Sequence, residues 1–309
     1  MTAACQNRGM PAGGGELPDL NEHASWRMAA ARRAGQAYAA NGRLAVLAVA
    51  GSVGTGQADR YSDLELDCYW LDAPADADRT APVRALGGRL EALWDYDCDE
   101  EEWSENYRLG DLDVTVSNFL VTSADRFIDD VVLRADTDPV KHMRLAAIQR
   151  SCPLVGAGLV ESWRARAACY PDDLAVSMVG RALAPDVLAG WAAREALVSR
   201  GDRLAVHGLI VRIEHAVVTA MLAVNRTYLP HRLVKWQRYL IAGLEVVPAG
   251  LADRLDGLWS GDSPAALAEA GALLVETTDL AEAHTGADLS EFRQAISERR
   301  RAIGPPRHA

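Results

Sequence analysis

Residues 44–66 read LAVLAVAGSVGTGQADRYSDLEL, and this stretch decides the fold. Its first part, LAVLAVAG, is a short apolar run that ends in glycine, which predicts a buried strand. A loop of glycine, serine and threonine follows over residues 51–58. From Asp63 to Asp67 acidic and apolar residues alternate strictly. This period of two predicts a second strand with one acidic face and one apolar face.

The ends of these two predicted strands carry residue types suited to phosphate and metal binding. Glycine at Gly51 permits close approach of a phosphate to the backbone, and the hydroxyl of Ser52 can donate to it. Asp63 and Glu65 point to the same side of a strand, about 6–7 Å apart. Hard cations such as Mg²⁺ favour carboxylate oxygens. Asp113, in the later alternating run GDLDVTVSNFLV, adds a third carboxylate if its strand pairs beside the first.

Three crowded carboxylates repel one another, so we expect divalent cations or a function to offset that cost. Two metal ions bridged by such a cluster suit phosphoryl or nucleotidyl transfer, in which the attacking and leaving oxygens must both be stabilised. The candidate catalytic and metal-binding residues are therefore Asp63, Glu65 and Asp113.

This arrangement resembles the nucleotidyltransferase superfamily of the DNA polymerase β type. The family pattern is an apolar residue with Gly-[Gly/Ser], then Asp-x-[Asp/Glu] flanked by apolar residues, then a carboxylate on a neighbouring strand. It matches at Gly51-Ser52, after ten intervening residues at Asp63-Leu64-Glu65-Leu66, and at Leu112-Asp113-Val114. Within the superfamily, the size and a trailing helical region resemble the group that adenylylates aminoglycosides and lincosamides. The C-terminal likeness rests on architecture and on AVNRTYLPHRLVKW, residues 223–236.

The resemblance implies an α+β fold, with a small mixed sheet followed by an all-α bundle. It implies two Mg²⁺ ions and a nucleoside triphosphate whose phosphates lie against Gly51 and Ser52. A cation from the helical region, with Lys235 as the candidate, would neutralise the triphosphate. AMP from ATP would pass to a hydroxyl of a small molecule, and pyrophosphate would leave.

Several alternatives stay open at the level of the sequence. Asp113 either completes the metal site or acts as the general base, and Glu101 or Glu102 could take the second role. Asp67 follows Glu65 on the same face and is an alternative metal ligand. The transfer could also be directed to a protein or RNA target. If the protein is not an enzyme, the alternative is a nucleotide-binding or antitoxin-like module without catalytic activity.

The chain is predicted to contain two domains. We expect a disordered leader at 1–20, a catalytic domain at 21–122, a helical domain at 123–303 and a flexible tail at 304–309. The catalytic domain is predicted to include helices over 22–41 and 81–94. After residue 123 the strand signals end, and Ala/Leu-rich helical patterns separated by prolines continue to the C-terminus.

Composition excludes several classes of protein. The formal charge of the chain is −11. This charge argues against a protein that binds nucleic acid non-specifically, and it suits a cationic acceptor or a metal site. Five cysteines at wide spacing without a C-x-x-C motif argue against a disulfide framework and a zinc ribbon. No apolar segment of the signal-peptide kind is found at the N-terminus, so a cytoplasmic enzyme is expected, with no membrane partner. The sequence does not fix the oligomeric state.

Overall fold

The computed structural model describes residues 20–232 and 234–303, and the chain divides into two compact units at Cys169/Tyr170. Nearly all of the predicted leader and the whole of the predicted tail lie outside the described residues. Each unit is described separately below.

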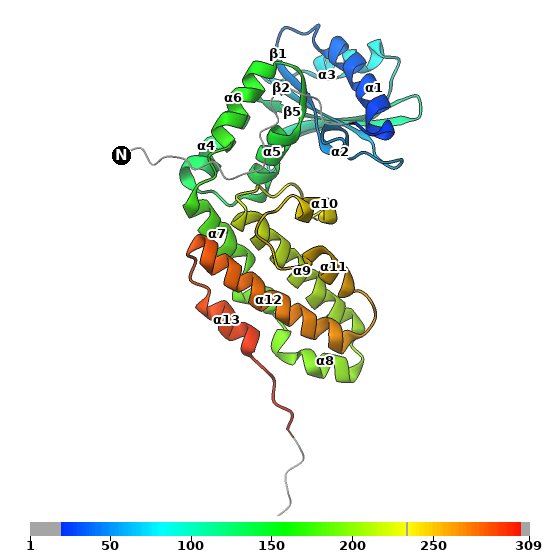
Figure 1. Cartoon of the computed structure of the whole chain (residues 1–309). Coiled ribbons are helices and arrows are strands. Elements are labelled where there is room, and N and C mark those ends of the chain that lie inside the picture. Colours follow the sequence, from blue (N-terminus) through cyan, green and yellow to red (C-terminus); the bar gives the residue numbers. More distant parts are fainter. Residues whose placement is uncertain (1–19, 233, 304–309) are drawn as a thin grey trace, which may run out of the picture. The chain divides into compact units, whose positions relative to one another are not determined.

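The first unit is built on a six-stranded mixed sheet (Figure 1). Its strand order is β3-β4-β5-β2-β1-β6. Strands β2 and β5 are parallel, and every other neighbouring pair is antiparallel. The strands are β1 (Leu44–Val49), β2 (Leu64–Trp70), β3 (Arg89–Asp97), β4 (Glu102–Leu109), β5 (Leu112–Leu120) and β6 (Cys152–Val155).

Helices cover both faces of this sheet. Helices α1 (Glu22–Tyr38) and α3 (Asp76–Ala85) pack on one face, and α5 (Pro139–Arg150) and α6 (Ala157–Ala167) contact the other (Figure 1). The short α2 (Gly51–Gly54) follows β1, and α4 (Val121–Arg134) follows β5. Together with the helical second unit, this is the predicted α+β fold.

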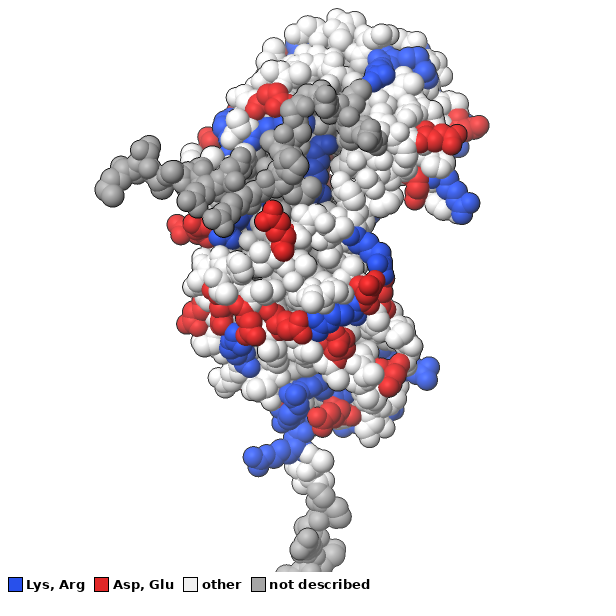
Figure 2. Space-filling view, viewed as in Figure 1, with Lys and Arg blue, Asp and Glu red and all other residues white. Residues whose placement is uncertain are grey.

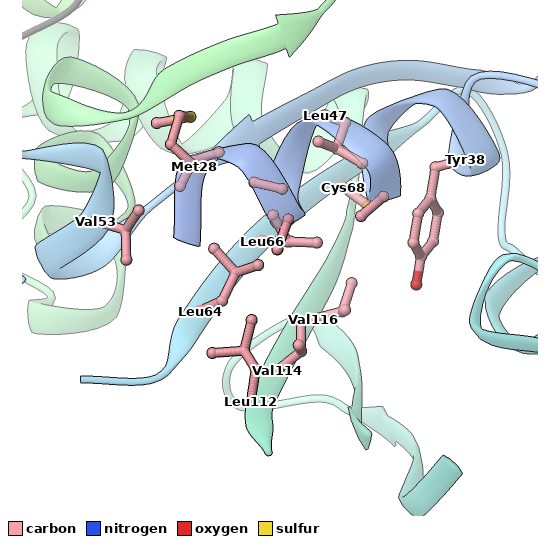
Figure 3. Close-up of a cluster of buried hydrophobic side chains, with 14 of the residues drawn as sticks. Met28, Tyr38, Leu47, Val53, Leu64, Leu66, Cys68, Leu112, Val114 and Val116 are labelled. Atoms are coloured by element: carbon pink, nitrogen blue, oxygen red, sulfur yellow. The ribbon is translucent and has the colours of Figure 1, made fainter. Parts of the chain in front are cut away.

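The alternation predicted for β2 decides which face is buried against α1. Leu64 and Leu66 join one apolar cluster with Val114 and Val116 of β5 and Met28 of α1 (Figure 3). These four strand residues are at most 1% exposed. Because successive side chains of a strand point to opposite faces, the acidic residues of β2 must lie on the other face of the sheet.

Two predictions about the first unit differ from the structure. The predicted helix over 81–94 ends at Ala85, and β3 begins at Arg89 after Gly87, which has φ +71°. This φ lies in the left-handed region that glycine adopts without strain. A strand also occurs beyond residue 123, since β6 pairs with β1.

The division at Cys169/Tyr170 also lies beyond the predicted boundary at 122/123. The physical reason is that β6, α5 and α6 pack on the sheet, which ties residues 123–169 to the first unit. These segments are helical in pattern, so their composition alone resembles that of the second unit.

The second unit is helical. Its helices are α7 (Asp172–Ala182), α8 (Arg194–Arg200), α9 (Arg203–Val224), α10 (Gln237–Ala242), α11 (Leu251–Gly257), α12 (Ser263–Thr285) and α13 (Ser290–Ser297), with short 3₁₀ turns at Pro185–Leu188 and Trp191–Ala193.

Helix α9 is the central element of the second unit and packs against α7 and α12. It is long and apolar enough to cross a membrane, and within the described residues it alone passes that test. Over its most apolar window, 56% of it is buried inside the protein, which is how a core helix packs.

Acidic and basic side chains are interspersed on the visible face of the second unit (Figure 2). Ion pairs such as Arg254 with Glu276, at 2.7 Å, and Arg293 with Asp279, at 2.6 Å, bring opposite charges together. This visible face therefore carries no continuous basic surface of the kind that nucleic-acid binding requires.

Candidate functional site

The carboxylate of Glu65 lies directly against Gly51. The backbone N–H of Ala50 donates to the carbonyl of Glu65 at 3.0 Å, which joins the end of β1 to β2. Gly51 has φ +58°, and a Cβ built on it would lie 2.3 Å from Oε2 of Glu65. A larger residue would be strained at this φ, and its Cβ would push the flexible end of Glu65 away from the turn. The predicted proximity of the Gly-Ser turn and the second carboxylate is therefore present in the structure.

The turn after β1 is also closely packed at its other glycine. A Cβ on Gly54 would lie 2.4 Å from the carbonyl oxygen of Val49. The backbone N–H of Gly54 donates to the carbonyl of Ala50. The first N–H groups of a helical turn have no partner inside that turn, and in this turn those groups begin at Gly51. Such groups can hydrogen-bond an anion.

Helix α1 fixes the loop that leads into Asp63. The guanidinium of Arg27, only 3% exposed, donates through Nε to the carbonyl of Ser62 at 2.9 Å. Asn21 Nδ2 donates to the carbonyl of Ala58 at 2.8 Å. Burial lowers the pKa of Arg27, an effect that Asp59 and Asp63 oppose by their charge. The buried cation thus holds the backbone beside Asp63 and provides it with a nearby positive charge.

Asp113, the second residue of β5, lies at the same level as Asp63, which directly precedes β2. In the parallel pair β2–β5, Leu64 lies opposite Val114 and Glu65 opposite Thr115, and the two aspartates directly precede these pairs. Asp113 shares the face of Thr115, away from the apolar cluster. Its carboxylate, which is 62% exposed, accepts two hydrogen bonds from Arg108. We call Asp63, Glu65, Asp113 and Arg108 the charged strip.

A buried polar network lies further along the same face. Arg144 of α5 donates to Asp67 Oδ2 at 2.9 Å and lies 3.5 Å from a carboxylate oxygen of Glu102. Its guanidinium stacks 3.3 Å from the ring centroid of Phe119. Burial raises the pKa of Asp67, and the charge of Arg144 opposes this rise. Asp67, the alternative metal ligand, is therefore engaged by this arginine.

The two glutamates proposed as alternative bases have different surroundings. Glu101 accepts hydrogen bonds from Arg126 and from Ser123 Oγ. Glu102 is paired with Arg144 at 3.5 Å. Both carboxylates therefore already have partners that fix their positions.

Glu102 makes the stability of the first unit depend on pH. Burial raises its pKa from 4.5 to about 7, while Arg144 opposes the rise. The folded state therefore binds this proton more tightly, and stability is lost as pH rises from about 4.5 through 7. From pH 5 to pH 7.5, the free energy of unfolding measured in urea should fall by about 1–2 kcal/mol more for the wild type than for Glu102→Gln. Equal pH slopes for the two proteins would contradict this assignment.

Arg144 should stabilise the fold strongly. Arg144→Met leaves Asp67 and Glu102 without their shared cation, and Asp67 has a side chain only 8% exposed. We expect a loss of about 2–4 kcal/mol in the free energy of unfolding, measured by urea denaturation. The matched control is Arg134→Met, which breaks an exposed pair with Asp130 and should cost less than about 1 kcal/mol. Equal losses in the two variants would show that the network is not stabilising.

The structure brings together some of the predicted site residues and leaves others separate. Among the described residues no group of three or more His, Cys, Asp or Glu side chains is placed to hold a metal ion. Asp113 is paired with Arg108 instead, so its role as third ligand stays a prediction. Lys235 is exposed, just before α10 in the second unit, and its contact with the triphosphate also stays a prediction. Arg226, another cation of the segment 223–236, pairs with Asp172 at 2.7 Å.

Sequence reasoning missed Arg27, Gly54, Arg108 and Arg144. Gly54 lies within GSVGTG, where a second glycine three residues after the first was a usable signal. Arg108 precedes Asp113 by five residues, with a turn at Gly110 between them. A prediction of a hairpin around this turn would have placed Arg108 opposite Asp113. No local signal marks Arg27 or Arg144, because their partners lie 35 and 77 residues away.

Comparison with known proteins gives limited information. A family described as "Domain of unknown function (DUF4037)" matches residues 140–237, which run from α5 to the start of α10. No curated protein matches the chain significantly. Among solved structures, a nucleotidyltransferase-like protein from Exiguobacterium sibiricum 255-15 is similar at 13% identity and a TM-score of 0.38. The similarity covers 83% of this chain and 75% of that one. The functional argument therefore rests on the residues of the site.

Proposed function

We propose that the chain is a Mg²⁺-dependent nucleotidyltransferase that moves AMP from ATP to a hydroxyl of a small molecule and releases pyrophosphate. The observation that carries the proposal is the contact between Glu65 and Gly51. It places a carboxylate beside a turn whose backbone can approach a phosphate, with Asp63 two residues earlier, directly before β2. The proposed acceptors are aminoglycosides, lincosamides or other hydroxylated natural products, and the proposed location is the cytoplasm.

The residues present fit magnesium. Mg²⁺ is usually held by one or two carboxylates together with substrate phosphates, rather than by a cage made only of protein ligands. Asp63 and Glu65 supply hard oxygen ligands, and Glu65 is exposed on the sheet face that carries the charged strip. When bound, the metal would stabilise charge on the α-phosphoryl group and on the leaving pyrophosphate. Asp113 is the proposed third ligand.

The reaction follows from the order of groups along this face. Backbone N–H groups of the turn at Gly51 and Ser52 bind the triphosphate and hold the α-phosphorus near the carboxylates. The acceptor oxygen forms a bond to the α-phosphorus, and the bond from that phosphorus to the bridging oxygen breaks. Pyrophosphate leaves with the electron pair, and the hydroxyl proton passes to water at this exposed face. The rate arises from positioning and charge stabilisation, without a covalent enzyme intermediate.

The charge of the hairpin β3–β4 would favour a cationic acceptor, from the end of β4 opposite to Arg108 and Asp113. Its tip, DYDCDEE, carries five carboxylates between Asp95 and Glu101. The rings of Trp94 and Tyr96 are 47% and 43% exposed. Carboxylates attract an aminosugar by long-range electrostatics, and exposed aromatic rings offer an apolar surface to a sugar face.

The direct test measures pyrophosphate release from ATP, GTP, CTP and UTP with a panel of aminoglycosides, lincosamides and nucleosides. We expect Mg²⁺-dependent release with ATP and at least one acceptor, together with an acceptor product heavier by one AMP group. Nucleotide binding without release from any donor and acceptor pair would favour a non-catalytic binding module. Labelling of protein or RNA in place of a small molecule would redirect the acceptor class.

A further inference from the structure

Arg108 and Asp113 form a well-defined ion pair within the charged strip. They lie directly opposite each other on the antiparallel strands β4 and β5. Nε and Nη2 of Arg108 donate to the same oxygen, Oδ1 of Asp113, at 2.9 and 2.6 Å. The two side chains are 46% and 62% exposed. An exposed cross-strand pair of this kind contributes at most about 1 kcal/mol to folding stability.

The position of the pair connects it to the proposed metal ligands. Asp63 and Asp113 enter adjacent parallel strands at the same level, and Glu65 follows on β2. Three carboxylates on neighbouring positions repel one another unless a cation neutralises them. In the structure the guanidinium of Arg108 neutralises Asp113, and Arg27 supplies a positive charge near Asp63. Arg89, the next cation across the sheet, pairs with Glu91 at 2.6 Å.

We propose that Arg108 is the resident counter-ion of Asp113 and gives this carboxylate up when a divalent cation binds at Asp63 and Glu65. The inference rests on the proposed function, since it assigns the third ligand of that site. An arginine cannot lose its proton at ordinary pH, so Arg108 can release Asp113 only by turning away. Its exposed, flexible side chain permits this movement. The guanidinium and the metal are alternative partners of one carboxylate.

This arrangement has a consequence that a purely structural ion pair would not have. Arg108 competes with the divalent cation for Asp113 and repels it as a like charge. Removing Arg108 should therefore strengthen metal binding, although it removes an ionic contact from the protein. The competitive part of the effect must disappear when Asp113 is also replaced, whereas simple charge repulsion remains.

The experiment is a double-mutant cycle on the full chain, read as Mn²⁺ affinity from the electron paramagnetic resonance signal of free Mn²⁺. The variants are Arg108→Met, Asp113→Asn and the two combined. We expect Arg108→Met to tighten Mn²⁺ binding about tenfold and Asp113→Asn to weaken it. In the Asp113→Asn background, the effect of Arg108→Met should fall to about twofold or less. Arg84→Met, which removes an exposed cation from α3, controls for net charge and should leave the affinity unchanged.

The outcomes separate this inference from the proposed function. Equal effects of Arg108→Met with and without Asp113, or no effect at all, would overturn the counter-ion role while Mn²⁺ binding at Asp63 and Glu65 still stands. Unchanged Mn²⁺ binding in Asp63→Asn, or no binding by the wild type, would overturn the proposed metal site and this inference with it. Arg108→Lys, which keeps the charge but not the two-pronged contact, should give an intermediate affinity.

Discussion

Asp63→Asn should reduce nucleotidyl transfer by about a thousandfold or more while the protein stays folded. The substitution removes a negative ligand from the proposed metal site, and metal charge stabilisation contributes several kcal/mol to such reactions. It also removes one charge from a group of mutually repelling carboxylates, which seldom destabilises a fold. Pyrophosphate release measures the activity, and thermal unfolding monitors the fold.

The control for this prediction is Asp111→Asn. Asp111 is an exposed acidic residue in the turn between β4 and β5, close in sequence to the site but outside the charged strip. Its replacement should change the rate less than about twofold. Retained turnover in Asp63→Asn, or an equal loss in Asp111→Asn, would move the metal site away from β2.

Gly51→Ala should reduce transfer by about a hundredfold through the position of Glu65. The new Cβ would lie 2.3 Å from Oε2 of Glu65, so the carboxylate must move away from the turn. Misplacement of a reacting group by about 1 Å commonly costs this much in rate. The backbone at φ +58° also disfavours alanine, which adds about 1 kcal/mol or more of destabilisation.

Gly42→Ala is the matched control for this glycine. A Cβ at Gly42 meets no atom within 4 Å, and the residue precedes β1 in a turn. The Gly42→Ala variant should transfer AMP at the rate of the wild type. If Gly51→Ala lost only stability and kept its rate per folded molecule, the close contact with Glu65 would be structural.

The elements that carry the motif were predictable from the sequence because they obey local rules. The apolar run before Gly51 and the alternation from Asp63 each specify a strand without reference to distant residues. The alternation also predicts that Asp113 and Thr115 share a face. The parallel pairing of β2 with β5 then puts the backbone of Asp113 level with that of Asp63.

The rest of the site depends on contacts that local patterns do not encode. Arg144 reaches Asp67 from a helix that follows the sheet strands, and its helical pattern alone assigned it to the second domain. The strand β6 is four residues long and contains Pro153, which concealed its pairing with β1. The helix predicted over 81–94 was wrong beyond Ala85, because packing in the sheet overrode helical periodicity there.

The central claim is that Asp63 and Glu65 together hold a divalent cation against the triphosphate. Anomalous diffraction from a crystal soaked with Mn²⁺ and an ATP analogue that resists cleavage at the α-phosphate tests it most directly. The account predicts a manganese peak within about 2.5 Å of carboxylate oxygens of both residues, with the α-phosphate bound to the same ion. Bound analogue with its manganese at other side chains, or with none at Asp63 and Glu65, would contradict it.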